Sequence, residues 1–367
     1  MKILLLCWRD TAHPQGGGSE RYLERVGEYL AAHGHDVVYR TAAAPGLPRR
    51  SERGGVRYSR SGGKYGVYVR AFLAMLAGRL GLGTLRGVDC VVDTQNGIPF
   101  FARLASGKPT VVLTHHCHRE QWPVAGPLIG RLGWWLESRV SPAVHRRACW
   151  VTVSEPSAAE LAELGVPREQ IHIIRNGVDP IPGRVPHLPD DGRTHLVTLS
   201  RLVPHKQIEH AMDVVRELDD SVVLDVVGSG WWSDELCSYA RKIGVLGRVR
   251  FHGQVSEEHK HALLSRAALH LMPSRKEGWG LAVVEAAQHA VPTVGYRASR
   301  GLTDSVEDGV TGVLVDVPNQ LIAAVRELLA DDARRRELGA AAKARANGYS
   351  WEETGAAFEA LLRGLAS

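Results

Sequence analysis

Cysteine, aromatic side chains and long apolar runs are all scarce in this chain of 367 residues. The five cysteines are scattered, odd in number and never arranged as C-x-x-C, which excludes a disulfide framework and favours a reducing cytoplasm. No apolar run approaches the roughly eighteen residues of a membrane span, so we expect no transmembrane helix. Residues 1–10 contain a short apolar stretch without a small-residue cleavage site, which predicts a buried strand rather than a signal peptide.

The charge of the chain is uneven. Residues 1–180 carry 23 Lys and Arg against 15 Asp and Glu, a net charge of +8, whereas the remainder carries a net charge of −3. A basic half suits phosphates, anionic lipid or nucleic acid, and a solvated basic surface is the alternative. Aromatic residues make up only 6% of the chain and do not alternate with basic ones, which counts against a nucleic-acid-binding protein.

Apolar runs of strand length alternate with amphipathic segments along both halves of the chain, a pattern that predicts parallel βαβ units. Residues 180–194 interrupt the alternation with four Pro and no periodicity. We therefore expect an N-terminal domain over residues 1–180, a linker over 181–194 and a second domain over 195–350. Ligands of such sheets bind where the parallel strands end, and two facing domains would form a cleft.

Two glycine-rich segments suggest phosphate contacts. Val226–Ser233 (VVGSGWWS) imitates half of a dinucleotide fingerprint but lacks its third glycine, and Gly16–Glu20 (GGGSE) lies too far after the first strand for that fingerprint. Both segments are also explained as helix-entry turns. Three consecutive glycines, Gly16, Gly17 and Gly18, exceed what a turn needs, which favours a backbone that receives a phosphate or a sugar hydroxyl.

Charged side chains follow two strands of the second domain. Arg201 and Lys206 lie between a strand ending near Ser200 and a helix opening near Ile208, and two cations there suit a diphosphate. Surface solvation is the alternative for each cation alone. Glu277 lies in a loop after another strand, and Glu285 lies in a helix that we expect to begin near Gly280.

Carboxylates accept pairs of sugar hydroxyls, and glycines beside them let a backbone approach a ligand. Taken alone, a helix-entry acid and an exposed helix residue would explain Glu277 and Glu285 equally well. His115–Glu120 (HHCHRE) suggests a metal cluster, but neighbouring residues on one turn do not all point at one ion.

Together these motifs resemble the family 4 glycosyltransferases, which are retaining enzymes of the GT-B fold that use nucleotide sugars. The matching segments, in chain order, are GGGSE, THH (Thr114–His116), VTVSE (Val151–Glu155), IRNGVD (Ile174–Asp179), SRLVPHK (Ser200–Lys206), EGWGLAVVEA (Glu277–Ala286) and EDGVTGVLV (Glu307–Val315). The resemblance implies a GT-B fold of two Rossmann-like parallel-sheet domains facing a central cleft. It also implies that residues 351–365 form a helix that crosses back to the N-terminal domain.

The resemblance implies a role for each matching residue. Glu277 would hold hydroxyls of the donor sugar, Glu285 the ribose, and Arg201 and Lys206 the diphosphate. His116 would sit near the reacting carbon. The other donor-binding residues that it implies are Gly16, Gly17, Gly18, Val255, Gly278, Trp279, Gly280 and Leu281. Many family members carry Glu where this chain has Asp304, so the phosphate end of the site is expected to differ in detail.

The expected reaction moves a sugar from a UDP- or GDP-linked donor to a hydroxyl with retention of configuration and without a metal or other cofactor. No side chain is a clear covalent nucleophile, so front-face attack is expected. An epimerase on the same fold and a non-catalytic nucleic-acid-binding protein are the alternatives. The base, the sugar, the acceptor and the oligomeric state stay open.

Two segments of the basic half bear on the acceptor. Val67–Arg86 and Leu128–Ala148 combine apolar residues with arginines, a composition suited to anionic lipid and therefore to a lipid-linked acceptor at the inner face of a membrane. The alternative is a pair of helices packed on the sheet, because Trp134 and Trp135 are adjacent and cannot face the same way. A soluble natural-product acceptor stays equally open.

Overall fold

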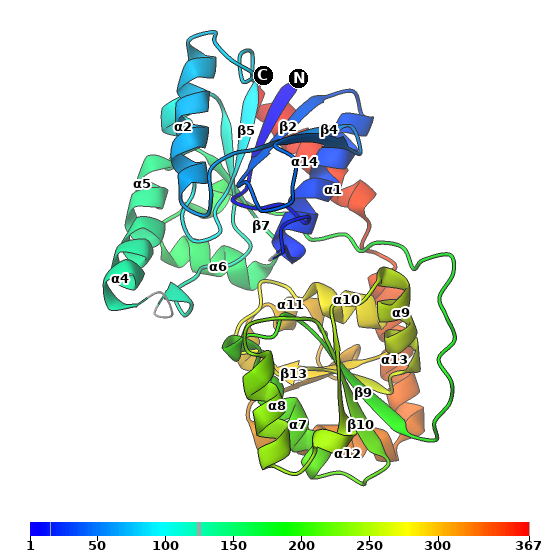
Figure 1. Ribbon diagram of the computed structural model, residues 1–367. Coiled ribbons are helices and arrows are strands. Elements are labelled where there is room, and N and C mark those ends of the chain that lie inside the picture. Colours follow the sequence, from blue (N-terminus) through cyan, green and yellow to red (C-terminus); the bar gives the residue numbers. More distant parts are fainter. Residues whose placement is uncertain (15, 123–125, 367) are drawn as a thin grey trace. The chain divides into compact units, whose positions relative to one another are not determined.

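The computed structural model describes residues 1–14, 16–122 and 126–366, and the chain divides into two compact units (Figure 1). The first unit comprises Met1–Gly177 together with the segment that starts at Ser350, and the second comprises Val178–Tyr349. Each unit contains one sheet with helices on both of its faces. The C-terminal helix α14 (Trp351–Ala366) therefore belongs with the N-terminal sheet.

The first unit contains an eight-stranded sheet in the order β3-β4-β2-β1-β5-β6-β7-β8, parallel except for the β3–β4 pair. Its strands are β1 (Lys2–Leu6), β2 (Asp36–Thr41), β3 (Arg50–Arg53), β4 (Val56–Arg60), β5 (Cys90–Thr94), β6 (Thr110–Leu113), β7 (Cys149–Thr152) and β8 (Ile171–Ile173). Its other helical segments are α1 (Gly18–Ala32), α2 (Gly66–Arg79), α3 (Ala102–Ser106), α4 (Pro127–Trp135), the π-helical turn Leu136–Val140, α5 (Ser141–Val144), α6 (Glu155–Glu163) and the 3₁₀ turn Arg168–Gln170.

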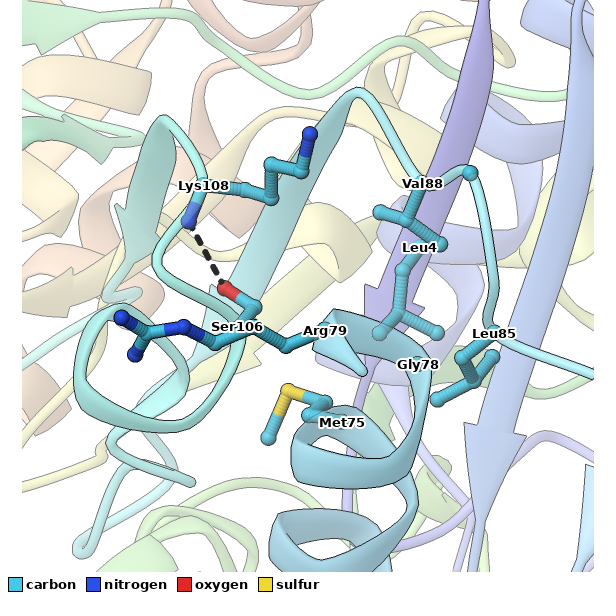
Figure 2. Close-up of a pocket in the computed structure, with 9 residues that line it drawn as sticks. Leu4, Met75, Gly78, Arg79, Leu85, Val88, Ser106 and Lys108 are labelled. Atoms are coloured by element: carbon cyan, nitrogen blue, oxygen red, sulfur yellow. Dashed lines mark hydrogen bonds between the residues drawn. The ribbon is translucent and has the colours of Figure 1, made fainter. Parts of the chain in front are cut away.

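Alternation along β1 separates the two faces of this sheet. Leu4 belongs to the apolar cluster under α2 and α3, where Met75 and Leu85 line a small hollow beside it (Figure 2). Leu5 faces the other way, because a Cβ on Gly27 of α1 would come within 2.8 Å of Leu5 Cδ1. Helices α1 and α14 pack closely together, with Gly355 of α14 fitting against the ring of Tyr29.

The second unit contains a six-stranded, all-parallel sheet in the order β11-β10-β9-β12-β13-β14. Its strands are β9 (Thr194–Leu199), β10 (Val222–Val227), β11 (Val249–Gly253), β12 (Leu269–Met272), β13 (Thr293–Tyr296) and β14 (Gly312–Val315). Its helices are α7 (Ile208–Arg216), α8 (Ser233–Lys242), α9 (Glu257–Arg266), α10 (Leu281–Ala287), α11 (Leu302–Ser305), α12 (Pro318–Ala330) and α13 (Asp332–Ala346), with 3₁₀ turns at Pro204–Lys206, Leu246–Arg248 and Arg297–Ser299.

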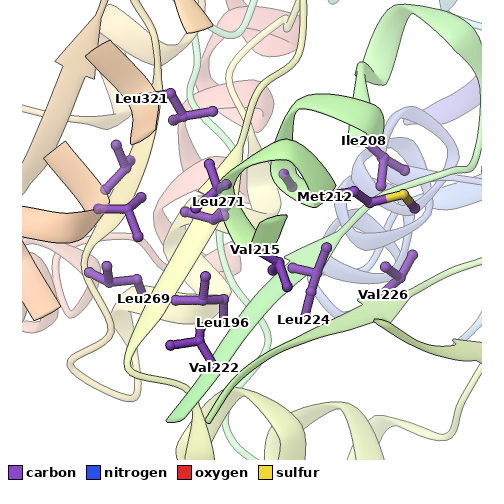
Figure 3. Packing of buried hydrophobic residues seen from close by; sticks show 14 of the residues in the cluster. Leu196, Ile208, Met212, Val215, Val222, Leu224, Val226, Leu269, Leu271 and Leu321 are labelled. Carbon is purple, nitrogen blue, oxygen red and sulfur yellow. The ribbon is translucent and has the colours of Figure 1, made fainter. Parts of the chain in front are cut away.

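The strands of this sheet are buried on both faces, as the near-continuous apolar runs of a parallel sheet require. On one face, Leu196 and Leu224 pack with Met212 of α7 and Leu321 of α12 (Figure 3). On the other face, the next residue of β9, Val197, packs with residues of α9 and α10. The helices on both faces fix the direction of the strands, and so the loops at the carboxyl ends emerge at one edge of the sheet.

Close backbone approach holds those loops together. A Cβ on Gly228 would lie 1.9 Å from the Ser200 oxygen, and one on Gly230 would lie 2.0 Å from the Leu202 oxygen. The glycine-rich segment after β10 therefore packs directly against the loop after β9, which is a sufficient reason for its glycines without a dinucleotide. A Cβ on Gly301 would likewise lie 2.6 Å from the Glu277 oxygen.

The predicted α/β alternation is confirmed, and the helix expected near Gly280 is α10, which begins at Leu281. The elements not predicted from the sequence include the β3–β4 hairpin, α3, β8, α11 and α13. Among the described residues, no helix combines the length and the apolarity that crossing a bilayer requires. All five cysteines are free thiols.

Candidate active site

An ion pair between Lys206 and Glu277 lies at the carboxyl edge of the second unit's sheet. Lys206 ends the 3₁₀ turn that follows β9, and Glu277 lies in the loop that follows β12. Their Nζ and Oε1 atoms are 2.5 Å apart, and the side chains are only 13% and 10% exposed. The backbone supports the pair, because the Arg275 N–H donates to the His205 carbonyl at 2.8 Å.

The surroundings of Glu277 favour its charged form. Burial, the largest single effect, would raise the pKa of this carboxyl group. The charge and hydrogen bond of Lys206, with a further hydrogen bond from Ser274, outweigh burial and hold the pKa below its usual value. The pKa of the adjacent His205 falls to about 4, mainly through burial and then through the charge of Lys206. The imidazole of His205 beside the Lys206–Glu277 ion pair is therefore neutral at neutral pH.

The loop that carries Glu277 is fixed from two sides. The Glu277 N–H donates to the Ser299 carbonyl at 3.0 Å, and a parallel bridge joins Glu277 to Arg300. At the other end of the loop, Gly280 takes φ +96° as it enters α10, a conformation that strongly favours glycine. The position of the carboxylate is thus set by backbone contacts as well as by its ion pair.

Trp279, which the sequence pattern placed among the donor-binding residues, is only 1% exposed. Its Nε1 donates to Asp304 Oδ1 at 3.3 Å, and its ring meets Tyr349 edge to face at 4.8 Å. A ligand at this loop therefore meets the backbone of Gly278 and Trp279 rather than the indole ring. Asp304, the departure from the family pattern, anchors that ring, and Leu281, the first residue of α10, is half-buried.

The second glutamate, Glu285, lies on α10 and is 16% exposed. Its Oε1 lies 2.6 Å from Lys260 Nζ of α9, and the same amine lies 2.6 Å from Glu257 Oε2. Burial, the largest effect, raises the pKa of Glu285 above its usual value, and Lys260 only partly opposes it. Glu257 and Asp179 add negative charge that raises this pKa further. Lys260 is therefore the group that favours the charged form of Glu285 against burial.

Two other predicted residues lie in the same unit. Arg201 is exposed in the loop directly after β9, and Val255 follows β11 and packs half-buried against the apolar cluster under α9 and α10. Both follow strand ends, as does Glu277. The carboxyl edge of one sheet therefore gathers Arg201, Lys206, Val255 and Glu277, while Glu285 projects from the helix after the Glu277 loop.

The triple glycine lies in the first unit, where α1 begins after β1. Gly17 caps the helix, and its N–H donates to Glu20 Oε2 at 2.8 Å. Glu20 is fully buried and accepts from Arg9 Nε at 2.8 Å. A Cβ on Gly16 would lie 2.9 Å from the Asp10 oxygen, whereas one on Gly18 would meet nothing within 4 Å. Gly16 is thus needed for chain packing, and Gly18 leaves open space.

The histidines after β6 differ in their partners, although the rings of His116 and His118 lie 4.5 Å apart. His115 is buried edge to face against Tyr22 at 5.1 Å, and burial lowers its pKa to about 4. His116 Nε2 lies 3.0 Å from Gln121 Nε2, and His118 Nδ1 lies 3.1 Å from Glu137 Oε1. In residues 1–14, 16–122 and 126–366, no group of three His, Cys, Asp or Glu is arranged to hold a metal ion.

Sequence reasoning missed the supporting residues. Lys260 stands 25 positions before Glu285 and joins it only because α9 and α10 pack on the same sheet face. Ser274 and His205 were likewise overlooked beside Glu277. A lysine in an amphipathic helix gives no sign of its partner, so only the fold reveals these contacts.

The ion pair makes a prediction about stability. We expect Lys206→Met to lower the free energy of unfolding by about 3 kcal/mol at neutral pH, because it leaves a buried carboxylate unpaired. The wild-type pKa of Glu277 is lowered, so this carboxylate stabilises the fold above its unfolded pKa and less as pH falls. Without Lys206 the pKa rises, and the deficit of the variant should shrink as acid protonates Glu277.

Chemical denaturation of both proteins across acidic and neutral pH measures this deficit. The double variant Lys206→Met/Glu277→Gln should recover much of the loss, because no unpaired charge remains. A deficit that is independent of pH and unchanged in the double variant would contradict the ion-pair explanation.

Two family descriptions match the sequence consecutively: "Glycosyltransferase Family 4" over residues 16–181 and "Glycosyl transferases group 1" over residues 184–345. A glycogen synthase of Mycobacterium tuberculosis is 28% identical, over 96% of this chain and 92% of its own. The GDP-mannose-dependent alpha-(1-6)-phosphatidylinositol monomannoside mannosyltransferase of the same organism is 28% identical, over 72% of this chain and 71% of its own.

Solved structures support the same fold. Sucrose-phosphate synthase from Thermosynechococcus elongatus superposes with a TM-score of 0.83 at 22% identity, covering 99% of this chain and 98% of its own. HepE of Anabaena, solved with UDP-glucose, gives a TM-score of 0.79 at 19% identity over the full length of both chains. The fold is therefore of the GT-B class. The chain belongs to glycosyltransferase family 4 and is an enzyme that uses a nucleotide-sugar donor.

Proposed function

We propose that this enzyme transfers a sugar from a UDP- or GDP-linked donor to a hydroxyl group, with retention of configuration and without a metal ion. The observation that carries the proposal is the buried Lys206–Glu277 pair at the carboxyl edge of a parallel sheet, where ligands of such sheets bind. A carboxylate beside a lysine presents an acceptor for sugar hydroxyls next to a donor for phosphate oxygens.

The leaving group determines the roles of the cations. Lys206 Nζ has three N–H donors and gives one of them to Glu277, so two are left for phosphate oxygens. Arg201, exposed two residues after the end of β9, adds a second cation at the same edge. As the bond from the anomeric carbon to the diphosphate oxygen breaks, these charges stabilise the oxyanion.

The acceptor hydroxyl attacks from the face that the diphosphate leaves, and its proton passes to the departing diphosphate oxygen. The new glycosidic bond therefore keeps the configuration of the donor. Glu277 orients the donor sugar through its hydroxyls, and backbone groups of Gly278 and Gly280 approach the sugar and phosphates closely. This scheme needs no covalent enzyme intermediate.

The nucleoside is assigned to the second pair. Glu285, beside Lys260, accepts hydrogen bonds from the two ribose hydroxyls, and backbone groups near Val255 meet the base. In this assignment the second unit is the donor domain, residues 181–194 are the linker, and the first unit is the acceptor side. His116 and the open backbone at Gly18 are then assigned to the acceptor side.

We further propose a lipid-linked acceptor, reached from the cytoplasmic face of a membrane. Exposed apolar residues form stripes at helical spacing on two helices of the basic unit. On α2 and its N-cap the stripe comprises Tyr65, Val69 and Leu73, and on α4 it comprises Leu128, Leu132 and Trp135. Trp135 is 54% exposed, whereas Trp134 packs against a core cluster, so only one of the two tryptophans is available to lipid.

Arginines accompany both stripes, with Arg70 and Arg79 exposed on α2 and Arg131 on α4. An apolar stripe beside exposed cations suits an anionic lipid surface. The M. tuberculosis mannosyltransferase, whose name specifies a phosphatidylinositol monomannoside, is a relative with such an acceptor.

The first test of the proposal is donor turnover. A panel of nucleotide sugars, read by thermal shift, should identify a donor that stabilises the protein by mass action. With that donor, we expect Glu277→Gln to lower kcat/KM by about tenfold to a hundredfold, the worth of hydrogen bonds to a charged group. Glu327→Gln, at an exposed position on α12, is the matched control.

An unchanged rate in Glu277→Gln would refute the donor-site assignment. EDTA should leave the wild-type rate unchanged, and a metal-dependent rate would refute the metal-free scheme. Release of the nucleoside diphosphate should require an added acceptor, because an epimerase would turn over without one.

The second test concerns the Lys260–Glu285 pair. Without Lys260, burial together with Glu257 and Asp179 should raise the pKa of Glu285 further. We therefore expect Lys260→Met to raise the donor KM increasingly as pH falls, because the ribose-binding form is the carboxylate. Lys260→Arg should restore the wild-type profile.

Glu285→Gln removes the titrating group, so its donor KM should be higher at all pH values and lack this added pH dependence. A Lys260→Met profile parallel to the wild type would show that Lys260 has no electrostatic role.

The membrane proposal predicts binding to vesicles. Flotation with phosphatidylglycerol vesicles at low salt should carry the protein, and phosphatidylcholine vesicles or high salt should not. Leu73→Asp and Leu132→Asp should each weaken binding, whereas Val310→Asp, an exposed apolar residue of the second unit, should not. An enzyme that stays unbound at low salt, with full activity toward a soluble acceptor, would eliminate the proposal.

A further inference from the structure

The first unit contains a second hollow, at the opposite edge of its sheet from the histidines that follow β6. Its volume is about 470 Å³, and its walls include Lys108 and Thr110 at the start of β6, Arg147 just before β7, Arg103 on α3 and Leu365 on α14. His116 lies beyond the other end of β6, roughly 13 Å of strand away. The hollow is therefore separate from the acceptor side proposed above.

Cations dominate this hollow. Arg103, Lys108 and Arg147 reach it from three different segments, and none of the residues that line it is acidic. Throughout the described ranges, the side-chain nitrogens of these residues form no ion pair or hydrogen bond with the protein. Elsewhere in the same unit, arginines are paired, as Arg60 is with Asp10 at 2.6 Å and Arg9 with Glu20 at 2.8 Å.

A fourth cation adjoins the hollow. Arg79, at the end of α2, runs beside the turn formed by Ser106–Lys108, as Figure 2 shows. A Cβ on Gly107 in that turn would lie 3.4 Å from the Arg79 guanidinium carbon, so this close approach favours glycine. The turn itself is held by the Lys108 N–H, which donates to Ser106 Oγ at 3.2 Å.

The cationic and apolar side chains that line the hollow indicate the class of ligand that it binds. Like charges in one hollow repel one another until an anion neutralises them, and Arg and Lys pair most strongly with phosphate and carboxylate oxygens. Pro109 and Leu365 add apolar wall, which suits a carbon skeleton attached to the anion. The volume lies within the range of small-molecule sites, roughly 300–1,000 Å³.

We infer that this hollow binds a phosphate ester, through Arg103, Lys108 and Arg147, at a site distinct from the donor and acceptor sites. The ester is either a soluble phosphorylated metabolite or the headgroup of an anionic phospholipid, because both present the same phosphate chemistry. A soluble ligand would make the hollow an effector site, and a headgroup would make it an anchoring site.

Protection of Lys108 from acylation tests the inference with a local readout. Wild-type protein is acetylated briefly with an N-hydroxysuccinimide ester, with or without glycerol phosphate, and each lysine is quantified by mass spectrometry. Sodium chloride at matched ionic strength is the reference. We expect the ligand to slow labelling of Lys108 severalfold and to leave Lys343, exposed on α13, unchanged. A parallel arm replaces glycerol phosphate with phosphatidylglycerol vesicles.

Protection by glycerol phosphate supports a soluble ligand, and protection by vesicles alone supports a headgroup. The variant Arg103→Gln/Arg147→Gln should lose the protection in either arm while keeping its thermal unfolding temperature, because these side chains support no described contact. The inference is overturned if neither arm protects Lys108, if Lys343 is protected equally, or if protection persists in the variant.

Discussion

A buried carboxylate needs a cation, and this requirement organises the edge of the second sheet. Glu277 is 10% exposed, and without Lys206 the burial of its unpaired negative charge would destabilise the fold. The two residues stand 71 positions apart, so their contact requires β9 and β12 to be neighbours in the sheet. Once the pair forms, the loops that carry Gly278 and His205 have fixed positions. The pair thus links a packing constraint to the chemistry proposed for the edge.

The two glutamates of the Glu-x7-Glu pattern are in different electrostatic environments. Lys206 and Ser274 lower the pKa of Glu277 despite its burial, whereas burial raises the pKa of Glu285 and Lys260, opposed by Glu257 and Asp179, does not reverse that rise. The difference follows from neighbours and not from exposure, since the side chains are 10% and 16% exposed. In the proposed mechanism Glu277 lies near the diphosphate, where its ion pair with Lys206 holds that amine at the same edge of the sheet. Glu285 holds neutral hydroxyls and only needs to remain an acceptor.

Local sequence patterns predicted most strands and helices, but they did not predict contacts between residues far apart in the chain. Apolar runs identified most strands, and the Gly278–Gly280 segment located the start of α10. Hydrophobic periodicity and turn-forming residues are both properties of neighbouring positions in the sequence. The β3–β4 hairpin escaped because Arg50–Arg53 is polar, although Gly54 and Gly55, both at positive φ, are the two-residue turn that such hairpins favour. Lys260 and the burial of Trp279 depend on packing between separate elements, which no local pattern encodes.

The distribution of charge on the first unit was likewise not predictable from local sequence patterns. The net charge of +8 over residues 1–180 suggested a basic surface, but the structure separates paired from unpaired cations. Near the end of β1, Asp10 and Glu20 are buried and each is paired with an arginine, so that edge is neutralised internally. At the opposite edge, Arg103, Lys108 and Arg147 line an open hollow without a described acidic partner. Part of the excess charge therefore lies at the edge opposite the loops proposed to face the acceptor. An electrostatic attraction to phosphate would act at that edge and on the exposed helices, at positions separate from the end of β1 where Asp10 and Glu20 are paired.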